Sequence, residues 1–367
     1  MIHQLILAAG LAGGLPACQE AVSPTTTVRE TVDQVVMPHI TLGSNVGVIV
    51  GVSRNGEQTI CSYGEAELGT RTPITAESVL EIASLTKTFT ALALADMHLK
   101  GEVNLDDSLG KYLPPNVKVP SWHGKTITLR QLANHTSGLP ALPTNIDKEA
   151  FNHYQGYSLS KLYDFMNQHV LEYEPGTHYQ YSNLGYGLLG VALSLRNGSD
   201  YESLIGQRVA RPLGMRQLVV GSNPGPFPTR VPGYNGNLRI ESWAGAMQPS
   251  MQGSGALMTT MPDLLRYLDA NMGLTSTALG PALALTHQRT FSLAGYQQDG
   301  IGLGWSLVTL NGHQITWKNG LNGGFTAFMG FDKATQTGVV VLCNSSLNPD
   351  LLQTQMGFAI LKSLNQH

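Results

Sequence analysis

The chain has 367 residues, of which 42% are hydrophobic and 13% are charged, and its formal net charge at pH 7 is −3. This composition is typical of a globular protein of low charge density, long enough for two domains or one large one. Because the net charge is small and the Lys and Arg residues are scattered, the sequence argues against a nucleic-acid-binding surface.

The N-terminal stretch Leu5–Cys18 is apolar and rich in small residues. It is too short to span a bilayer and is typical of a signal-peptide core, although no Lys or Arg precedes it. Cys18, after Leu-Pro-Ala, resembles a bacterial lipoprotein cleavage site, and the alternative is a plain export signal cleaved nearby. We therefore expect residues 1–18 to be a signal peptide and residues 19–27 a tether. The protein would be periplasmic or otherwise exported, with a lipid anchor at Cys18 left open.

The next segments are predicted from hydrophobic periodicity and turn residues. Valines recur at helical spacing over Val28–Ile40. Two strand-like runs, Asn45–Ser53 and Gln58–Ala66, flank an Asn-Gly pair, which is a strong hairpin signal. A helix then begins at Ser84 and runs to Lys100, ahead of a glycine that can cap it.

The middle of the chain is predicted to be helical and rich in loops. Apolar residues recur at helical spacing in Thr128–Thr136, Leu159–Val170, Tyr186–Gly198, Tyr201–Met215 and Thr259–Gly273. The last of these segments opens with a predicted capping box from Thr260 to Asp263.

The C-terminal part of the chain changes to short strands linked by Gly and Asn turns, and a helix follows from Asp350. The strands are predicted at Gly304–Leu310, His313–Trp317, Phe325–Phe331 and Thr337–Ser345.

Strands thus lie at both ends of the chain, with helices between them. The simplest fold that joins these elements is an α/β (α+β) fold of two lobes, formed by a single domain over residues 28–367. Residues 28–83 and 295–367 would form an antiparallel sheet flanked by helices, and residues 84–294 would form an inserted, mainly helical lobe. The junction of two such lobes is a common place for a pocket.

Ser84 and Lys87 lie three residues apart at the start of a predicted helix, so they share one helix face. The helix is apolar nearly all round, which predicts that Lys87 is buried. Burial and a second nearby cation would lower the lysine pKa, and the helix N-terminus would favour negative charge on Ser84. This is the arrangement of an activated serine nucleophile, although Ser-x-x-Lys by itself is a common surface pattern.

Two further short motifs could complete such a site. Tyr181 and Asn183 stand in a turn, where a tyrosine between two lysines could be driven toward phenolate and act as a general base. The alternative for an isolated Tyr-x-Asn is a polar turn that opens the next helix. Lys318, Asn319 and Gly320 lie near a strand end, where a glycine lets a substrate backbone approach and the lysine could bind a carboxylate. The alternative there is a hairpin end with a solvated lysine.

In this order and separation, the motifs SLTK, YSN and KNG resemble those of the serine β-lactamase and penicillin-binding-protein superfamily. The flanking sequence, from about Gly47 to Ser345, is similar to the class C-like branch and most similar to the AmpH-type D-alanyl-D-alanine carboxypeptidase/endopeptidases. The stretches SYGE, LDDSLGKYLPPNVKVP and ITLRQLANHTSGLP carry this second likeness. The resemblance implies the β-lactamase/transpeptidase-like fold.

The resemblance also implies roles for the first two motifs. Ser84 would accept the acyl group as the nucleophile. Lys87 and Tyr181 would share proton transfer, with the identity of the base left open. Asn183 would orient Lys87 and the substrate.

For the third motif, the resemblance implies a substrate-binding strand. Lys318, with Asn319 and Gly320, would bind the substrate carboxylate and support the catalytic tyrosine electrostatically. The backbone N–H groups of Ser84 and Leu321 would form the oxyanion hole. Asn319 stands where the superfamily usually has threonine, which puts the choice of substrate in doubt.

Several other sites are not supported by the sequence. It has no Gly-x-Ser-x-Gly elbow, no His-Glu-x-x-His or Cys-x-x-Cys metal spacing, and no Glu-x-x-Leu-Asn loop of the class A β-lactamases. His135, in the stretch NHTSG, is interpreted as a structural histidine. Cys61 and Cys343 lie in apolar strand-like runs, which predicts buried free thiols, with a bridge between them left open.

We therefore expect a serine hydrolase that acts through an acyl-enzyme on D-Ala-D-Ala-type peptides of peptidoglycan and binds β-lactams covalently. A class C-like β-lactamase and a promiscuous esterase are the catalytic alternatives. A non-catalytic penicillin-binding recognition module is the alternative from another class. The protein would be a monomer acting on small-molecule substrates, without nucleic acid, cofactor or metal.

Overall fold

The computed structural model describes residues 27–222, 230–293, 298–346 and 351–365. The predicted signal peptide, with Cys18, and nearly all of the predicted tether lie outside the described residues. Within the described part, no helix is both long enough and apolar enough to cross a membrane.

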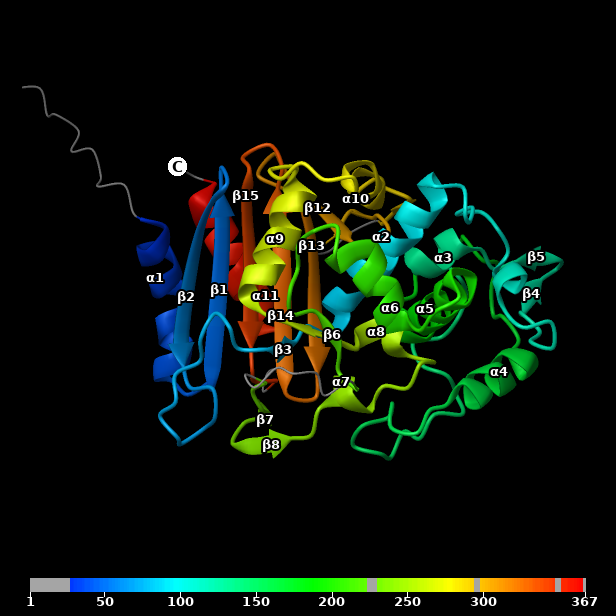
Figure 1. Ribbon diagram of the computed structural model, residues 1–367, viewed down its shortest axis with the longest axis horizontal. Coiled ribbons are helices and arrows are strands. Elements are labelled where there is room, and N and C mark those ends of the chain that lie inside the picture. The colour runs from blue at the N-terminus through cyan, green and yellow to red at the C-terminus, as the bar shows by residue number, and fades with distance from the viewer. Residues whose placement is uncertain (1–26, 223–229, 294–297, 347–350, 366–367) are drawn as a thin grey trace, which may run out of the picture.

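The largest element is an antiparallel sheet whose strands come from both ends of the chain (Figure 1). In the described residues its eight strands lie in the order β10-β11-β12-β13-β14-β15-β1-β2. Their bounds are β1 (Gly47–Arg54), β2 (Glu57–Gly64), β10 (Phe291–Ser292), β11 (Gly300–Ile301), β12 (Ser306–Leu310), β13 (His313–Asn322), β14 (Phe325–Asp332) and β15 (Thr337–Cys343). The predicted fold class is confirmed. The sheet extends to β10, which lies before the predicted boundary at residue 295.

Helices cover both faces of this sheet (Figure 1). Alternate residues of β15 point to opposite faces: Val341 packs in a cluster with α1 (Val28–Thr41) and α11 (Leu352–Leu364), and Val340 packs in a cluster with α9 (Met261–Met272). Because neither face meets water, β15 is buried along its whole length. The continuous apolar run of this strand follows from that burial.

The two remaining cysteines lie on either side of β1. Cys61 on β2 pairs with Val50, and Cys343 on β15 pairs with Val48. Two strand spacings, roughly 9.5 Å, separate such neighbours, which is beyond the roughly 7 Å that a disulfide spans between Cα atoms. Both thiols are free and buried, so the strand register excludes the bridge that the sequence left open.

The helical lobe lies between the sheet strands in sequence and packs beside β12 and β13 (Figure 1). Its helices and turns are η1 (Ala83–Leu85), α2 (Thr86–Leu99), η2 (Leu109–Tyr112), α3 (Leu129–Ala133), α4 (Leu159–Gln168), α5 (Asn183–Asn197), α6 (Tyr201–Ile205), η3 (Gly206–Ala210), α7 (Trp243–Ala246), α8 (Gln252–Gly255) and α10 (Gly280–Thr286). Small sheets are formed by β3 (Leu80–Glu81), β9 (Leu257–Thr259) and β6 (Val219–Val220), by β4 (Ser121–Trp122) and β5 (Lys125–Thr126), and by β7 (Gly233–Asn235) and β8 (Leu238–Ile240). At the centre, α2 is buried from Thr86 to Met97.

The predicted capping box at the start of α9 is wrong. Thr260 is the N-cap residue, but its side chain makes no capping hydrogen bond. The carboxylate of Asp263 instead accepts hydrogen bonds from the backbone N–H groups of Arg216, at 2.7 Å, and Gln217, at 2.6 Å. The carboxylate therefore ties a preceding loop to α9 instead of capping its own helix.

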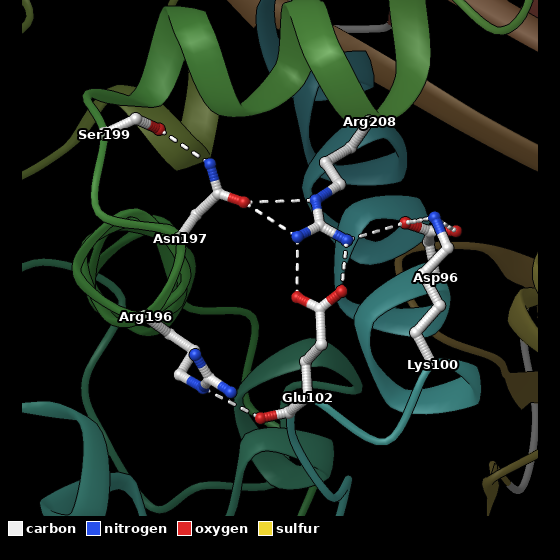
Figure 2. A network of polar contacts seen from close by, with 7 residues as sticks. All are labelled: Asp96, Lys100, Glu102, Arg196, Asn197, Ser199 and Arg208. Carbon is white, nitrogen blue, oxygen red and sulfur yellow. Dashed lines mark hydrogen bonds and ion pairs between the residues drawn. The ribbon is translucent and has the colours of Figure 1, made fainter.

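A network of charged side chains holds three helical segments of the lobe together (Figure 2). Arg208, on η3, forms a bidentate ion pair with Glu102 at 2.8 and 2.6 Å and reaches Asp96 on α2 at 3.2 Å. Its other donors meet the Asn197 side chain at the end of α5. Lys100 also pairs with Asp96, at 2.8 Å. The ends of α2 and α5 are thereby fixed relative to η3, on the far side of α2 from Ser84.

Candidate active site

The predicted nucleophile Ser84 lies where the helical lobe meets the sheet. It sits in the 3-10 turn η1, and the α-helix proper begins at Thr86, two residues later than predicted. The preceding residue, Ala83, has φ +47°, a conformation that costs energy in a residue with a side chain. A Cβ placed on Gly320 would lie 2.7 Å from the Ser84 nitrogen. Glycine at position 320 therefore lets β13 pass directly against the nucleophile.

Lys87 is completely buried and directs its amine at Ser84. Its Nζ atom lies 3.0 Å from Ser84 Oγ, 2.7 Å from Asn183 Oδ1 and 2.6 Å from the backbone oxygen of Ser254. Burial, and to a lesser extent the charge of Lys318, lowers the pKa of Lys87 well below its usual range. The site therefore favours the neutral amine.

A neutral Lys87 matches its three neighbours better than a charged one. A neutral amine has two N–H donors and one lone pair, and two of its neighbours, Asn183 Oδ1 and the Ser254 oxygen, are acceptors only. With both N–H groups used there, the lone pair faces Ser84 Oγ, which can donate its proton to it. This is the hydrogen-bond pattern of a serine beside a general base.

Tyr181 reaches Ser84 from the loop just before α5. Its hydroxyl lies 2.7 Å from Ser84 Oγ and donates to it. The amines of Lys318 and Lys87 lie 4.7 and 4.9 Å from the centre of its ring. Burial nevertheless raises the pKa of Tyr181, against the lowering effect of its hydrogen bond to Ser84. The predicted drift toward phenolate is therefore wrong for the resting site, where the phenol keeps its proton.

Lys318 lies on β13 and directs its amine toward the ring of Tyr181. It is 5% exposed, and burial lowers its pKa to about 8. Among the described residues it forms no ion pair with a carboxylate, and neither does Lys87. At neutral pH Lys318 thus remains mostly protonated and offers a poorly solvated positive charge to an incoming anion.

Asn183 joins the site to the helix behind it. Its Oδ1 accepts from Lys87, while its Nδ2 donates to the Tyr154 hydroxyl at 3.0 Å. The preceding Ser182 caps α5, accepting from the Gly185 N–H at 2.9 Å. The turn therefore opens a helix, as the alternative prediction had it, and also serves the site. The cap at Ser182 fixes the Asn183 side-chain amide beside Lys87.

The predicted substrate contact of Asn319 is not supported by the position of its side chain. Neighbouring strand residues point to opposite faces, so Asn319 faces away from Lys318. Its amide donates to the Thr354 hydroxyl on α11, at 3.1 Å, on the covered face of the sheet. The superfamily usually has a threonine at this position. The Asn319 amide does not take the place of that threonine hydroxyl, because it ties β13 to α11.

The predicted oxyanion hole is compatible with the packing of β13. Gly320 and Leu321 follow Lys318 on the strand, and the close approach of Gly320 to the Ser84 nitrogen brings the two backbones together. The Leu321 side chain is about half exposed. Two backbone N–H groups from separate segments are the usual composition of such a hole.

Sequence reasoning missed several supporting groups. Glu81 is buried, and its carboxylate accepts from Asn322 Nδ2 at 2.6 Å and from the Ala244 N–H at 3.1 Å, which ties the nucleophile segment to β13 and α7. Burial raises the pKa of this carboxyl.

The Ser254 oxygen beside Lys87 had no sequence signal, because a backbone carbonyl is the same in every residue. Among the described residues, no cluster of three or more His, Cys, Asp or Glu side chains could hold a metal ion.

Comparisons with known proteins agree with this geometry. The family model for Beta-lactamase matches residues 32–356. The chain is 26% identical to a beta-lactamase of Pseudomonas fluorescens, over 93% of this chain and all of that protein. It is 29% identical to the D-alanyl-D-alanine-carboxypeptidase/endopeptidase AmpH of Escherichia coli K12, over 84% of this chain and 82% of that protein. A solved class C beta-lactamase superposes with a TM-score of 0.80 at 26% identity, covering 92% of this chain and 96% of that chain.

The chain therefore belongs to the beta-lactamase family, in its class C and AmpH branch, and is a serine hydrolase.

Proposed function

We propose that this serine hydrolase cleaves D-Ala-D-Ala-type peptides of peptidoglycan, as a carboxypeptidase/endopeptidase, through an acyl-enzyme on Ser84. The proposal depends chiefly on one observation: the buried Lys87 amine contacts Ser84 Oγ while its other two neighbours are acceptors. β-Lactams, which present a strained amide beside a carboxylate, would acylate the same serine.

In acylation, Ser84 Oγ attacks the substrate carbonyl carbon and its proton passes to the neutral Lys87 amine. The carbonyl oxygen takes up negative charge and would be stabilised by the N–H groups of Ser84 and Leu321. When the C–N bond breaks, the neutral Tyr181 phenol, 2.7 Å from Ser84 Oγ, is placed to give its proton to the leaving nitrogen. The proton that Lys87 gained then passes to Tyr181, so that both side chains regain their resting protonation states.

In deacylation the same groups act on water. Lys87, neutral again, would take a proton from a water molecule that attacks the acyl carbon, and would give that proton to the Ser84 oxygen as the acyl bond breaks. During acylation, before the C-terminal D-Ala leaves, Lys318, poorly solvated and mostly protonated at neutral pH, would hold the substrate carboxylate. A D-Ala-D-Ala peptide presents such a carboxylate one residue beyond the cleaved bond.

A class C-like β-lactamase is the second candidate, because beta-lactamases are among the similar proteins and share the fold. Both activities pass through an acyl-serine, so the rate of deacylation decides between them. A promiscuous esterase is a third candidate, which the buried Lys318 disfavours, since a neutral ester needs no carboxylate-binding cation. The reactive arrangement around Ser84 also disfavours a recognition module without catalysis.

Turnover of three substrates tests the proposal: a D-Ala-D-Ala muropeptide, nitrocefin and a p-nitrophenyl ester, each with wild-type protein and Ser84→Ala. The proposal predicts release of D-Ala from the muropeptide and stable labelling of Ser84 by a fluorescent penicillin. Fast nitrocefin hydrolysis without D-Ala release would favour the β-lactamase, and ester turnover alone would favour the esterase. Absence of any covalent label would favour the recognition module or a narrow esterase, and the ester assay separates these two.

We also propose that the protein is exported as a monomer and that residues 28–367 form one catalytic domain. The apolar stretch before Cys18 supports export, and the family match over residues 32–356 supports the single domain. Fractionation of a secreting host, with Cys18→Ala as the comparison, tests both export and lipidation. Retention in the membrane that is lost in the variant would indicate a lipid anchor.

A further inference from the structure

His135 lies directly behind Tyr181 and is almost wholly buried. Its backbone oxygen accepts a hydrogen bond from the Gln180 N–H at 2.8 Å, and its ring Nδ1 accepts one from the Ser182 N–H at 3.1 Å. Gln180 and Ser182 are the two chain neighbours of Tyr181. One residue therefore holds the backbone on both sides of the tyrosine.

The His135 ring also packs against the tyrosine side chain. The ring centres of His135 and Tyr181 are 4.5 Å apart, with the planes tilted by 37°, and the Tyr186 ring lies 5.1 Å away on the same histidine. Backbone and side chain of Tyr181 are thus both fixed by His135. The hydroxyl of Tyr181 must in turn meet Ser84 Oγ, at 2.7 Å.

The hydrogen bonds define one form of the imidazole. Nδ1 can accept from the Ser182 N–H only if its proton is on Nε2 and the ring is neutral. Burial, followed by the charges of Lys318 and Lys87, lowers the pKa of His135 well below its usual range, in agreement with the neutral ring. Nε2 is buried without a hydrogen-bond partner among the described residues.

Two features of His135 are unfavourable for stability alone. Its φ of +61° is rare for a residue other than glycine, and its Nε2 leaves a buried hydrogen bond unmade. A histidine retained only for packing would be better replaced by a residue without either cost. The bond that distinguishes it from such a replacement is the one from the Ser182 N–H to its ring Nδ1, because any residue could accept the bond from Gln180 on its backbone oxygen.

We infer that His135 is a positioning residue for catalysis, which holds the Tyr181 hydroxyl against Ser84 by clamping both chain neighbours of the tyrosine. The inference rests on the proposed acylation of Ser84 and adds to it a residue that does not touch the substrate. Its essential atom is the acceptor at Nδ1. The ring as a whole is secondary.

Two variants separate the acceptor from the ring. His135→Phe keeps an aromatic ring against Tyr181 and Tyr186 but removes the acceptor. His135→Asn removes the ring but places Oδ1 on Cγ, where Nδ1 stands in histidine, and asparagine tolerates the positive φ. The measurement is the rate of Ser84 acylation by a fluorescent penicillin at rising concentrations, which separates the bond-forming rate from the affinity of the initial complex.

We expect His135→Phe to lower the bond-forming rate by about tenfold to a hundredfold, because a small displacement of a proton donor has effects of that order. The affinity of the initial complex should stay the same. His135→Asn should acylate much faster than His135→Phe. Thr136→Val, which removes a buried hydrogen bond to Asn134 in the same loop, is the control for mere destabilisation and should acylate like wild type.

The result that overturns the inference is a folded His135→Phe protein that acylates at the wild-type rate, or an asparagine variant no faster than the phenylalanine one. If His135→Phe does not fold, His135→Ala takes its place in the same comparison. Failure of the wild-type protein to form any adduct is a different result, because it removes the proposed function together with this inference.

Discussion

Two clusters of basic side chains lie at opposite ends of α2, and their surroundings differ in kind. At the far end, Arg208 lies beside the carboxylates of Glu102 and Asp96 (Figure 2), and the hydrogen bonds that it donates to Glu102 raise its pKa further. At the near end, Lys87 and Lys318 are buried without a carboxylate ion pair among the described residues, and burial lowers the pKa of each. The first cluster stabilises positive charge, and the second destabilises it.

The difference shows that buried basic side chains serve two purposes in this protein: one cluster stabilises the fold, and the other can exchange a proton. A paired, charged arginine holds helices together and has no tendency to exchange a proton. A buried lysine with only neutral acceptors costs stability, but its amine can take a proton from serine near neutral pH. Substitutions at the two ends of α2 should therefore act on different quantities: acylation at the near end, and unfolding at the far end.

The largest effect is expected at Lys87. Lys87→Met removes the proposed base, and acylation of Ser84 by a fluorescent penicillin should slow by about 10²–10⁴-fold, the usual contribution of a positioned base. Thermal stability should not fall, because an apolar side chain replaces a buried amine. Lys100→Met, at the exposed end of the same helix, is the matched control and should acylate normally. A Lys87→Met protein with wild-type acylation would contradict the assignment of the base.

The second effect concerns Lys318 and pH. The folded pKa of Lys318, about 8, lies below its unfolded value, so the unfolded chain binds more protons between these values and stability rises with pH across that window. Lys318→Met lacks this dependence. At pH 7.5 the variant should be more stable than the wild type, because it has no poorly solvated charge at this position. The difference in unfolding free energy between the two proteins should shrink by about 2–3 kcal/mol at pH 10. Denaturant unfolding at the two pH values checks this, and a constant difference would show that Lys318 is not desolvated.

A smaller loss is expected at the far end of α2. Arg208→Met leaves the carboxylate of Asp96, which is nearly buried, with Lys100 as its remaining ion-pair partner among the described residues. Because the cluster is partly solvated, we expect a loss of about 2 kcal/mol in unfolding free energy, below the cost of breaking a fully buried pair. Arg239→Met, which breaks an exposed pair with Glu67, should change stability by less than about 0.5 kcal/mol. Slower acylation in Arg208→Met at a temperature where it is folded would break the separation of the two clusters.

The smallest effect is expected for Glu102→Gln. Hydrogen bonds from Arg208 hold the pKa of Glu102 below its usual range, so its stabilising effect is present above the unfolded pKa and is lost as the pH falls through the folded one. The cost of the substitution at pH 7 should be below about 1 kcal/mol, since the pair is partly exposed. Unfolding at pH 7 and pH 3.5 checks the sign, and a cost that grows on acidification would contradict it.

Much of the fold could be predicted because periodicity and turn residues are local signals. The two-strand hairpin at Asn55, the buried helix after Ser84 and the strands near the C-terminus each have such a signal, and their pairing into one sheet was confirmed. The motif order in the sequence also indicated which side chains would meet. The structure brings Ser84, Lys87 and Tyr181 within hydrogen-bond distance.

Other features could not be predicted because they depend on packing between distant segments. The face of β13 to which Asn319 points follows from strand alternation only once the sheet is known. The protonation of Tyr181 could not be predicted, since the motifs imply that Lys87 and Lys318 lie near it but do not show the complete burial that raises the phenol pKa. Asp263 looked like a capping residue because the loop at Arg216, which uses its carboxylate, is remote in sequence.

The protonation state of Lys87 tests the central claim most directly. Lysine side chains labelled with ¹³C at Cε report it by NMR, with the Lys87 resonance assigned by its loss in Lys87→Met and with Ser84→Ala used to prevent turnover. The structure predicts that this resonance titrates well below pH 10.4, because the amine is buried. A Lys87 resonance that titrates near pH 10.4 in the folded protein would contradict the account.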